Sequence, residues 1–455
     1  MSDVVAELFE LIPDAVILTD PDSTEAYRFD QARFCEAGKP LAVIKPTSTA
    51  EVVAVMKVAS AHGVPVVPQG GQSGLSGGAN AIDGCFVLNF TLMNRILEIN
   101  EIEQTVTVEP GVFNMDLSHA VLEKGLFYPP DPSSWDIATI GGNLATNAGG
   151  LCCVKYGVTT DYVRALEVVL ASGEVLNTGR VTAKGVAGYD LTSLMVGSEG
   201  TLGVITKAVL RLVPAPFAPL TAVGVFPTTT DAMNAVADIM AGPVRPSMLE
   251  FMDSNTIQAV NAYRNMGFPE DAGALLLAQS DRGELAPVDL DGFGAIFTQH
   301  HAIEVAISTD REESEMLMEA RRLVHWAMDA LGATMVEDVA VPRANMAELV
   351  NGVGKIAKAS GLKIPCHGHA GDGNLHPTVV FERGDPESEA KAVAAFGEVM
   401  ELALSLGGTI TGEHGVGELK AEYLIKELGP TSVRLQRELR RVFDPQGILS
   451  PGRVI

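Results

Sequence analysis

The stretch Pro68-Gln69-Gly70-Gly71-Gln72-Ser73-Gly74-Leu75-Ser76-Gly77-Gly78-Ala79 decides the fold of this chain. Ahead of it, the capping box Ser48-Thr-Ala-Glu51 and an apolar stripe predict a helix, followed by a strand at Val64–Val67. After this loop the chain continues into another apolar run, Cys85–Leu88, without an intervening helix. The glycine-rich loop is therefore expected to join a strand to a strand.

This order argues against a Rossmann dinucleotide fold. A Rossmann site needs its glycines between a strand and a helix, because the pyrophosphate lies on the N-terminus of that helix. A wide loop of glycines and small hydroxyl residues can still bind a diphosphate, since its backbone N–H groups form an anion-binding concavity. Taken alone, the loop can also be read as a long flexible hairpin.

Two further clusters of glycines and small polar residues follow the first loop. The second comprises Pro129–Ser134 and Thr139–Gly150, and the third comprises Gly188–Leu191 and Gly197–Thr206. Three such loops suit a long, flat, mostly apolar cofactor held by backbone groups, rather than a single phosphate.

Four of the nine histidines lie in two short glycine-bound segments, His367-Gly-His369-Ala-Gly-Asp-Gly-Asn-Leu-His376 and Gly412-Glu413-His414-Gly415-Val-Gly417. Fixed glycines indicate unusual backbone angles, which here would aim imidazoles and a carboxylate at one point. His369, His376 and Glu413 form a His₂Glu set, and three protein ligands with open positions are typical of a catalytic metal site. In an extended loop the side chains of Glu413 and His414 should diverge.

Residues 313–331 predict one helix with an apolar stripe. Arg321 borders this stripe, whereas Arg322 points away from it. An inward arginine suits a substrate carboxylate, and a surface arginine whose stem packs along apolar neighbours is the alternative. His325 follows one turn later, where a core or surface role is the simpler interpretation. We treat His62, His300 and His301 as structural.

The overall composition limits the number of domains, the partners and the cellular location to be expected. A chain of 455 residues, 47% hydrophobic and 20% charged, predicts two or three domains of ordinary soluble type. The net charge of −25, with no basic run, argues against nucleic acid and anionic membranes as partners. No apolar stretch is long enough to span a bilayer, and five cysteines fit a reduced compartment, so we expect a cytoplasmic protein. Packing rather than redox chemistry is the simpler role for Cys152-Cys153.

The three glycine loops resemble the FAD domain of flavoproteins of vanillyl-alcohol-oxidase type. The segments Gly368–Pro377 and Gly412–Gly417 narrow the resemblance to the FAD-linked D-2-hydroxy acid dehydrogenases and oxidases. That branch contains D-lactate dehydrogenase, the glycolate oxidase flavin subunit and D-2-hydroxyglutarate dehydrogenase. The similarity runs from about residue 38 to the C-terminus.

The resemblance implies an α+β fold with four parts. These are an N-terminal extension over residues 1–36, a two-subdomain FAD-binding domain over 37–215, an α+β cap with an antiparallel sheet that binds substrate and metal over 216–425, and a C-terminal segment over 426–455 that returns to the FAD domain.

The same resemblance implies a set of FAD-binding residues: Gly70, Gly71, Gln72, Ser73, Gly74, Leu75, Pro130, Ser134, Thr139, Gly142, Asn143, Thr146, Asn147, Gly149, Glu199, Gly203 and Ile205. Gln72 stands where relatives with covalently bound flavin have a histidine, so noncovalent FAD is expected. A cysteine linkage through Cys152 or Cys153 is the alternative.

The resemblance also assigns the chemistry. It places a divalent metal, Zn²⁺ or Mn²⁺/Fe²⁺, on His369, His376 and Glu413, and the substrate carboxylate on Arg321. Beyond the resemblance, we hypothesise that His414 removes the hydroxyl proton, because the ordinary pKa of imidazole lies near neutrality. The reaction would be oxidation of a D-2-hydroxy acid to the 2-oxo acid by hydride transfer to flavin N5. The enzymes that act on 2-hydroxyglutarate have an asparagine where this chain has Thr378, which leaves the identity of the metal open.

One position in the sequence, residue 336, bears on which hydroxy acid is the substrate. Relatives that oxidise the five-carbon diacid have a lysine where this chain has Val336, so D-lactate or a glycolate-like acid is favoured over D-2-hydroxyglutarate. Other cations that could substitute for that lysine are Arg322, Arg343 and Lys355.

Two other classes compete with this hypothesis. A flavin-free metallohydrolase would use the His₂Glu set but leave the glycine loops unexplained. A noncatalytic FAD-binding subunit of a larger oxidase complex would explain the loops but not the metal set. The electron acceptor is left open between oxygen, a quinone, an electron-transfer flavoprotein and an iron–sulfur subunit. A homodimer is an expectation from the family alone.

Overall fold

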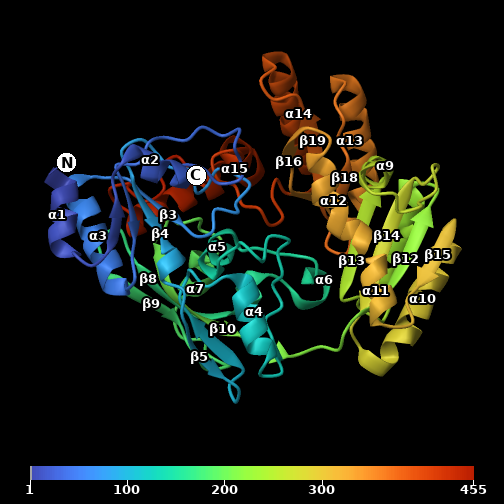
Figure 1. The fold of residues 1–455 in the computed structure, drawn as a ribbon, viewed down its shortest axis with the longest axis horizontal. Coiled ribbons are helices and arrows are strands. Elements are labelled where there is room, and N and C mark those ends of the chain that lie inside the picture. The colour runs from blue at the N-terminus through green and yellow to red at the C-terminus, as the bar shows by residue number, and fades with distance from the viewer. Residues whose placement is uncertain (1–2) are drawn as a thin grey trace. The chain divides into compact units, whose positions relative to one another are not determined.

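The computed structural model describes residues 3–455 as two compact units (Figure 1). Unit 1 comprises the chain up to Gly149, Val158–Ala215 and Glu413–Ile455. Unit 2 comprises Gly150–Gly157 and Pro216–Gly412. The chain therefore passes into unit 2 at Pro216.

Two boundaries differ from those expected from the sequence. The chain re-enters unit 1 at Glu413 rather than at residue 426, because the loop that follows is bound by Glu199 through the N–H groups of Val416 and Gly417. Residues 150–157 group with unit 2, where Lys155 and Tyr156 both bind the buried carboxylate of Asp281.

The N-terminal segment from Asp3 groups with unit 1. Helix α1 (Asp3–Leu11) buries Val5 and Leu8 in the same core as helix α3 (Thr49–His62). Met1 and Ser2 lie outside the described residues.

The first sheet of unit 1 contains the decisive loop. Its strands run in the order β1 (Val16–Leu18), β2 (Ala42–Lys45), β4 (Phe86–Asn89), β3 (Val66–Gln69). Ser48 caps α3 by accepting a hydrogen bond from Glu51 N–H, and Gly63 ends it in the left-handed conformation. Strands β3 and β4 are parallel neighbours joined by residues 70–85, in which no helix forms. The strand-to-strand prediction is confirmed.

The second sheet of unit 1 is antiparallel. Its order is β5 (Ile96–Asn100), β6 (Thr105–Val108), β10 (Val204–Arg211), β8 (Val163–Val169), β9 (Val175–Gly179), and a separate ladder pairs β7 (Leu126–Phe127) with β11 (Val213–Pro214). The remaining helices of unit 1 are α2 (Pro21–Thr24), α4 (Asn114–Leu122), α5 (Ile140–Thr146), α7 (Leu191–Met195) and α15 (Ala421–Phe443).

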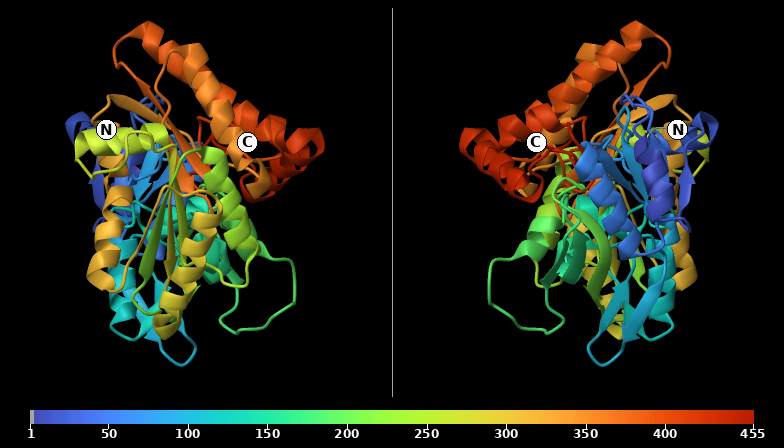
Figure 2. Two further views of the ribbon diagram at one scale, coloured as in Figure 1. Left: turned by 90° about the vertical axis from the view of Figure 1, so that its right-hand side faces the viewer. Right: turned by 90° about the vertical axis from the view of Figure 1, so that its left-hand side faces the viewer.

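Unit 2 is built on one large antiparallel sheet. Its order is β15 (Glu304–Ile307), β12 (Leu220–Phe226), β14 (Ala274–Ser280), β13 (Met248–Asp253), β18 (Cys366–His369), β19 (Asn374–Phe381), β16 (Ala333–Val336), and β17 (Val339–Ala340) also pairs with β19. Its helices are α6 (Cys153–Tyr156), α8 (Thr229–Ala241), α9 (Ser254–Tyr263), α10 (Ala286–Gln299), α11 (Arg311–Leu317), α12 (Glu319–Asp329), α13 (Met346–Ser360) and α14 (Pro386–Ser405). Helices α13 and α14 pack side by side (Figure 1 and Figure 2).

Helices cover both faces of this sheet. Because side chains alternate along a strand, Val223 and Val225 of β12 pack in one core with residues of α9 and α12, whereas Gly224 between them lies against Phe297 of α10. The central strands β13, β14 and β19 are consequently buried on both sides, and a charged side chain in the middle of one needs a partner.

The predicted single helix over residues 313–331 is wrong. The structure has α11 and α12, which meet at Met318. Arg321 nevertheless faces inward as expected, and the guanidinium of its neighbour Arg322 is exposed and binds Glu315. Within residues 3–455, no helix is both long enough and apolar enough to cross a lipid bilayer.

Candidate active site

Two histidines come from neighbouring strands of unit 2. His369 ends β18 and His376 lies near the start of β19, and a tight turn at residues 370–373 joins the strands. Gly373 has a positive φ of 79°, and a Cβ there would clash with the carbonyl of Val341. The two imidazoles are 3% and 5% exposed, with ring centroids 5.2 Å apart and nearly perpendicular planes. The glycine-framed turn thus aligns both rings.

The β-ladder places a row of polar groups on one face of the sheet. His376 is paired with His367, and Thr378 with Val336. Since side chains two apart on a strand share a face, His367, His369, His376, Thr378 and Val336 all lie on the same side. Val336 is therefore on the face that carries the histidines.

Both candidate ligand histidines have Nδ1 beside a protein acceptor. Nδ1 of His369 lies 2.7 Å from Oε1 of Glu250, and Nδ1 of His376 lies 3.3 Å from the carbonyl oxygen of Glu337. When Nδ1 carries the proton, the lone pair is on Nε2, which is the form of imidazole that binds metal. The surroundings of both rings fit metal ligands.

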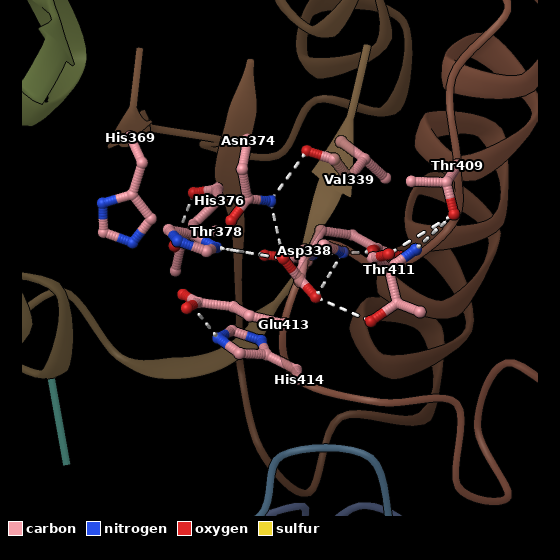
Figure 3. A network of polar contacts seen from close by, with 12 residues as sticks. Asp338, Val339, His369, Asn374, His376, Thr378, Thr409, Thr411, Glu413 and His414 are labelled. Atoms are coloured by element: carbon pink, nitrogen blue, oxygen red, sulfur yellow. Dashed lines mark hydrogen bonds and ion pairs between the residues drawn. The ribbon is translucent and has the colours of Figure 1, made fainter. Parts of the chain in front are cut away.

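Glu413 is brought to these histidines by its neighbour in the chain. The N–H of Gly412 donates to Asp338 at 2.9 Å, and the Thr411 hydroxyl donates to the same carboxylate at 2.7 Å (Figure 3). A Cβ at Gly412 would clash with the amide of Asn374, so the chain passes here only as glycine. Glu413 follows directly.

The predicted ligand set is assembled. His369, His376 and Glu413 each offer one ligand atom, and these atoms lie within 4.8 Å of one another (Figure 3). Two imidazole nitrogens and a carboxylate oxygen suit Zn²⁺, Mn²⁺ or Fe²⁺. Asp338, His376 and His414 form a second group that meets the same criterion, so two neighbouring sets share one histidine.

The expected divergence of Glu413 and His414 is wrong. Nε2 of His414 lies 3.9 Å from Oε1 of Glu413, and the two side chains turn toward each other (Figure 3). The loop is bent rather than extended at residues 412–414, and Gly415 and Gly417, which follow, both have positive φ. In unit 1, Glu199 accepts the N–H groups of Val416 and Gly417, and burial raises the pKa of Glu199 to about 7.

Glu250 is the main residue that sequence reasoning missed. It lies in β13 with a fully buried side chain, and its second oxygen accepts a hydrogen bond of 2.7 Å from Nε of Arg321. Burial alone would raise the pKa of Glu250, but the charges and hydrogen bonds of His369 and Arg321 outweigh burial and lower it. A signal existed, because an acid in the apolar strand Met248–Asp253 requires a buried partner.

Asp338 was also missed. Its buried carboxylate accepts hydrogen bonds from Asn374 Nδ2, the Thr411 hydroxyl and Gly412 N–H, and it lies 3.8 Å from Nδ1 of His376. It fixes the loop that leads to Glu413. No local pattern marks it, since its partners are strands and loops far along the chain.

Three of the remaining histidines lie beside carboxylates away from the His₂Glu set. His62 pairs with Glu7, His300 with Asp238, and the exposed His325 with Asp329. His367 faces His376 with ring centroids 5.7 Å apart, and burial together with the charge of Arg321 holds its pKa well below the usual value. His367 is therefore neutral at physiological pH.

The first glycine loop fits a phosphate-bearing cofactor. Among the described residues, no backbone N–H of residues 71–76 donates a hydrogen bond to another protein group. A series of such amides is an anion-binding concavity. The side-chain amide of Gln72 donates hydrogen bonds to the carbonyl oxygens of Ala26 and Phe29.

Residues of the second cluster have structural roles that build its shape. Thr139 caps α5 by accepting from Gly142 N–H, Asn143 accepts from Asn114, and Asn147 ends the helix in the left-handed conformation. These contacts neither require nor exclude contacts with a cofactor. The other predicted FAD residues stay predictions.

Comparisons with known proteins agree with this architecture. The family model of the FAD binding domain matches residues 40–179, and that of the C-terminal domain of FAD linked oxidases matches residues 216–454. The chain belongs to the FAD-linked oxidase family. It is an FAD-dependent oxidoreductase, and the match to the FAD binding domain includes the first two glycine clusters.

Relatives of this FAD-linked oxidase cover nearly its whole length. It is 45% identical to glycolate oxidase subunit GlcD of Bacillus subtilis (strain 168), over 91% of this chain and 89% of that protein. It is 35% identical to a D-lactate dehydrogenase of Archaeoglobus fulgidus, over 100% of this chain and 98% of that protein.

Among solved structures, p-cresol methylhydroxylase with substrate bound has a TM-score of 0.82 at 18% identity, covering 99% of this chain and 96% of that one. This likeness shows the fold. The predicted fold class, an FAD-binding domain of vanillyl-alcohol-oxidase type plus an α+β cap with an antiparallel sheet, is confirmed.

Proposed function

We propose that this protein oxidises a D-2-hydroxy acid, D-lactate or a glycolate-like acid, to the corresponding 2-oxo acid, with FAD bound noncovalently. The observation that carries the proposal is the arrangement in unit 2, where one buried carboxylate, Glu250, binds both the inward Arg321 and the His369 of the His₂Glu set. The names of the relatives, glycolate oxidase subunit and D-lactate dehydrogenase, support the same substrate class.

Arg321 is the group that would bind the substrate carboxylate. Its Nε–H is used by Glu250, and within the described residues this is the only hydrogen bond of its guanidinium. Four N–H donors are left on the terminal nitrogens, which can bind a carboxylate through two parallel hydrogen bonds. Its side chain is 11% exposed, so the ion pair would form with little screening by water.

His414 is the group that would remove the hydroxyl proton. Imidazole suits this task because its ordinary pKa lies near neutrality. A divalent metal held by His369, His376 and Glu413 would supply a positive charge that stabilises a developing alkoxide. FAD bound to the FAD-binding domain would supply the acceptor for the hydride that leaves Cα as the carbonyl forms.

A monocarboxylate is the better substrate for this site. At the position of the missing lysine, Val336 is apolar and paired with Thr378. Two of the cations that might replace that lysine have other contacts, since Arg322 binds Glu315 and Arg343 donates to the carbonyl of Gly371. A second substrate carboxylate would then lack a cation.

Steady-state kinetics over an acid series test this choice. The wild type should turn over D-lactate or glycolate with a higher kcat/KM than D-2-hydroxyglutarate. Val336→Lys should raise kcat/KM for the diacid about tenfold or more, the worth of one ion pair of about 1.4 kcal/mol. Val305→Lys, a change of the same kind on strand β15, should leave the preference unchanged. A wild type that prefers the diacid would contradict the monocarboxylate assignment.

The noncatalytic-subunit alternative makes a different prediction. Such a subunit would bind FAD but would not be reduced by a hydroxy acid in the absence of other proteins. The acceptor that reoxidises the flavin, a homodimer and a cytoplasmic location stay expectations, as does the choice between Zn²⁺, Mn²⁺ and Fe²⁺.

A further inference from the structure

Glu250 joins two elements of unit 2 that carry different functions. It lies in the middle of β13, where the register pairs Phe251 with Gly368 and so sets Glu250 opposite His369 on the adjacent strand. Its other neighbour, Arg321, comes from helix α12 packed over the same face. Contacts of 2.7 Å on each oxygen use both halves of the carboxylate.

We infer that Glu250 is a positioning residue that holds the metal ligand His369 and the carboxylate-binding Arg321 in one geometry. The inference rests on the proposed function and adds a residue to it. Through His369 it selects the imidazole tautomer whose Nε2 can bind metal. Through Arg321 it fixes the plane of the guanidinium by its Nε and leaves the terminal nitrogens to the substrate.

The burial of this carboxylate supports a specific role. Glu250 is fully buried, and an unpaired charge in such a place is strongly destabilising. An apolar residue would fill the strand at no such cost, as its neighbours Leu249 and Phe251 do. The position carries a charge where packing alone does not need one.

The near-isosteric variant Glu250→Gln separates positioning from packing. Nε of Arg321 always carries a proton, so the new amide must turn its carbonyl oxygen toward the arginine. Its NH₂ group then faces Nδ1 of His369, which can accept a hydrogen bond only if the imidazole proton moves to Nε2. A proton there blocks the nitrogen that would bind metal. Moving that proton costs less than setting an N–H group against a guanidinium, so the metal site is the part expected to fail.

The test is a measurement of metal affinity on the FAD-loaded enzyme, by competition of Zn²⁺ and Mn²⁺ with a chromogenic chelator. Glu250→Gln should weaken binding about 10- to 100-fold, the usual effect of losing an outer partner of a ligand histidine. Glu250→Asp keeps the charge but is one methylene shorter, so it should lose less. Saturating metal should restore much of the lost kcat in both variants, because it offsets the weaker binding.

Asp289→Asn is the matched control. Asp289 is also buried in unit 2, accepts hydrogen bonds from Arg282 and Ser280, and contacts no predicted ligand. Its metal affinity should equal that of the wild type.

The outcomes separate this inference from the proposed function. If the wild type binds metal, His369→Ala abolishes binding and Glu250→Gln binds as tightly as the wild type, the positioning role is overturned while the metal site stands. If Glu250→Gln does not fold, an unchanged affinity in Glu250→Asp overturns it equally. A wild type that binds neither cation overturns the metal site and this role together.

Discussion

Replacement of His414 by asparagine should slow reduction of the flavin by D-lactate about 10²- to 10⁴-fold, while FAD stays bound. Asparagine keeps the size and hydrogen bonding of the side chain but cannot accept a proton from the substrate hydroxyl. The loop itself should keep its shape, because Gly412 is held by Asp338, and Val416 and Gly417 by Glu199, through backbone N–H groups.

The measurement is anaerobic stopped-flow reduction, which observes the half-reaction without the electron acceptor. His325→Asn is the matched control, since His325 is exposed and pairs only weakly with Asp329 at 3.6 Å. It should be reduced at the rate of the wild type. A rate close to normal in His414→Asn would remove this residue from proton transfer and direct attention to the other imidazole on the same sheet face, His367.

Exchange of Arg321 for lysine should lower kcat/KM for the hydroxy acid about 100-fold or more, equivalent to about 3 kcal/mol. Lysine keeps the charge but presents a point donor in place of a planar fork. It also lacks the Nε–H that Glu250 accepts, so its ammonium would be drawn to that carboxylate and away from the substrate.

Arg322→Lys tests the same exchange one residue later, where the guanidinium is exposed and binds Glu315. That variant should have the kinetics of the wild type. The loss in Arg321→Lys should appear mainly in KM if the arginine binds substrate and transition state equally, and in kcat as well if it orients Cα for hydride transfer. Equal values of kcat/KM in the two variants would contradict the assignment.

Local signals in the sequence predicted much of what positions the site. Ser48 and Gly63 cap α3 because capping depends on residues a few positions apart. The absence of a helix after Gly70 could also be predicted, because it too depends on residues a few positions apart. Arg321 was recognised as inward because helical periodicity survives the break at Met318.

The long-range partners could not be predicted in this way. Glu250 and His369 lie 119 residues apart, and their contact depends on the pairing of β13 with β18. Asp338 contacts Gly412 from 74 residues away. Strand order and register are set by the whole sheet rather than by either strand, so a single sequence indicates that a buried acid needs a partner without saying which.

The loop after Gly412 shows a different limit. Glycines were recognised as a sign of unusual backbone angles, but the direction of the Glu413 and His414 side chains was not predictable from them, and the two side chains lie together rather than apart. Two candidate metal sets result, one with His369 and Glu413 and one with Asp338 and His414, both sharing His376. His414 can act as a base only where the metal is held by the set that contains His369 and Glu413.

The central claim is that a hydroxy acid reduces the flavin of this chain directly. The most direct test is the visible spectrum of the purified, FAD-loaded protein under anaerobic conditions, before and after separate additions of D-lactate, L-lactate, glycolate and D-2-hydroxyglutarate. We predict an oxidised flavin band that D-lactate or glycolate bleaches and L-lactate does not. A flavin band that none of the four acids bleaches, in protein supplied with Zn²⁺ or Mn²⁺, would contradict the claim.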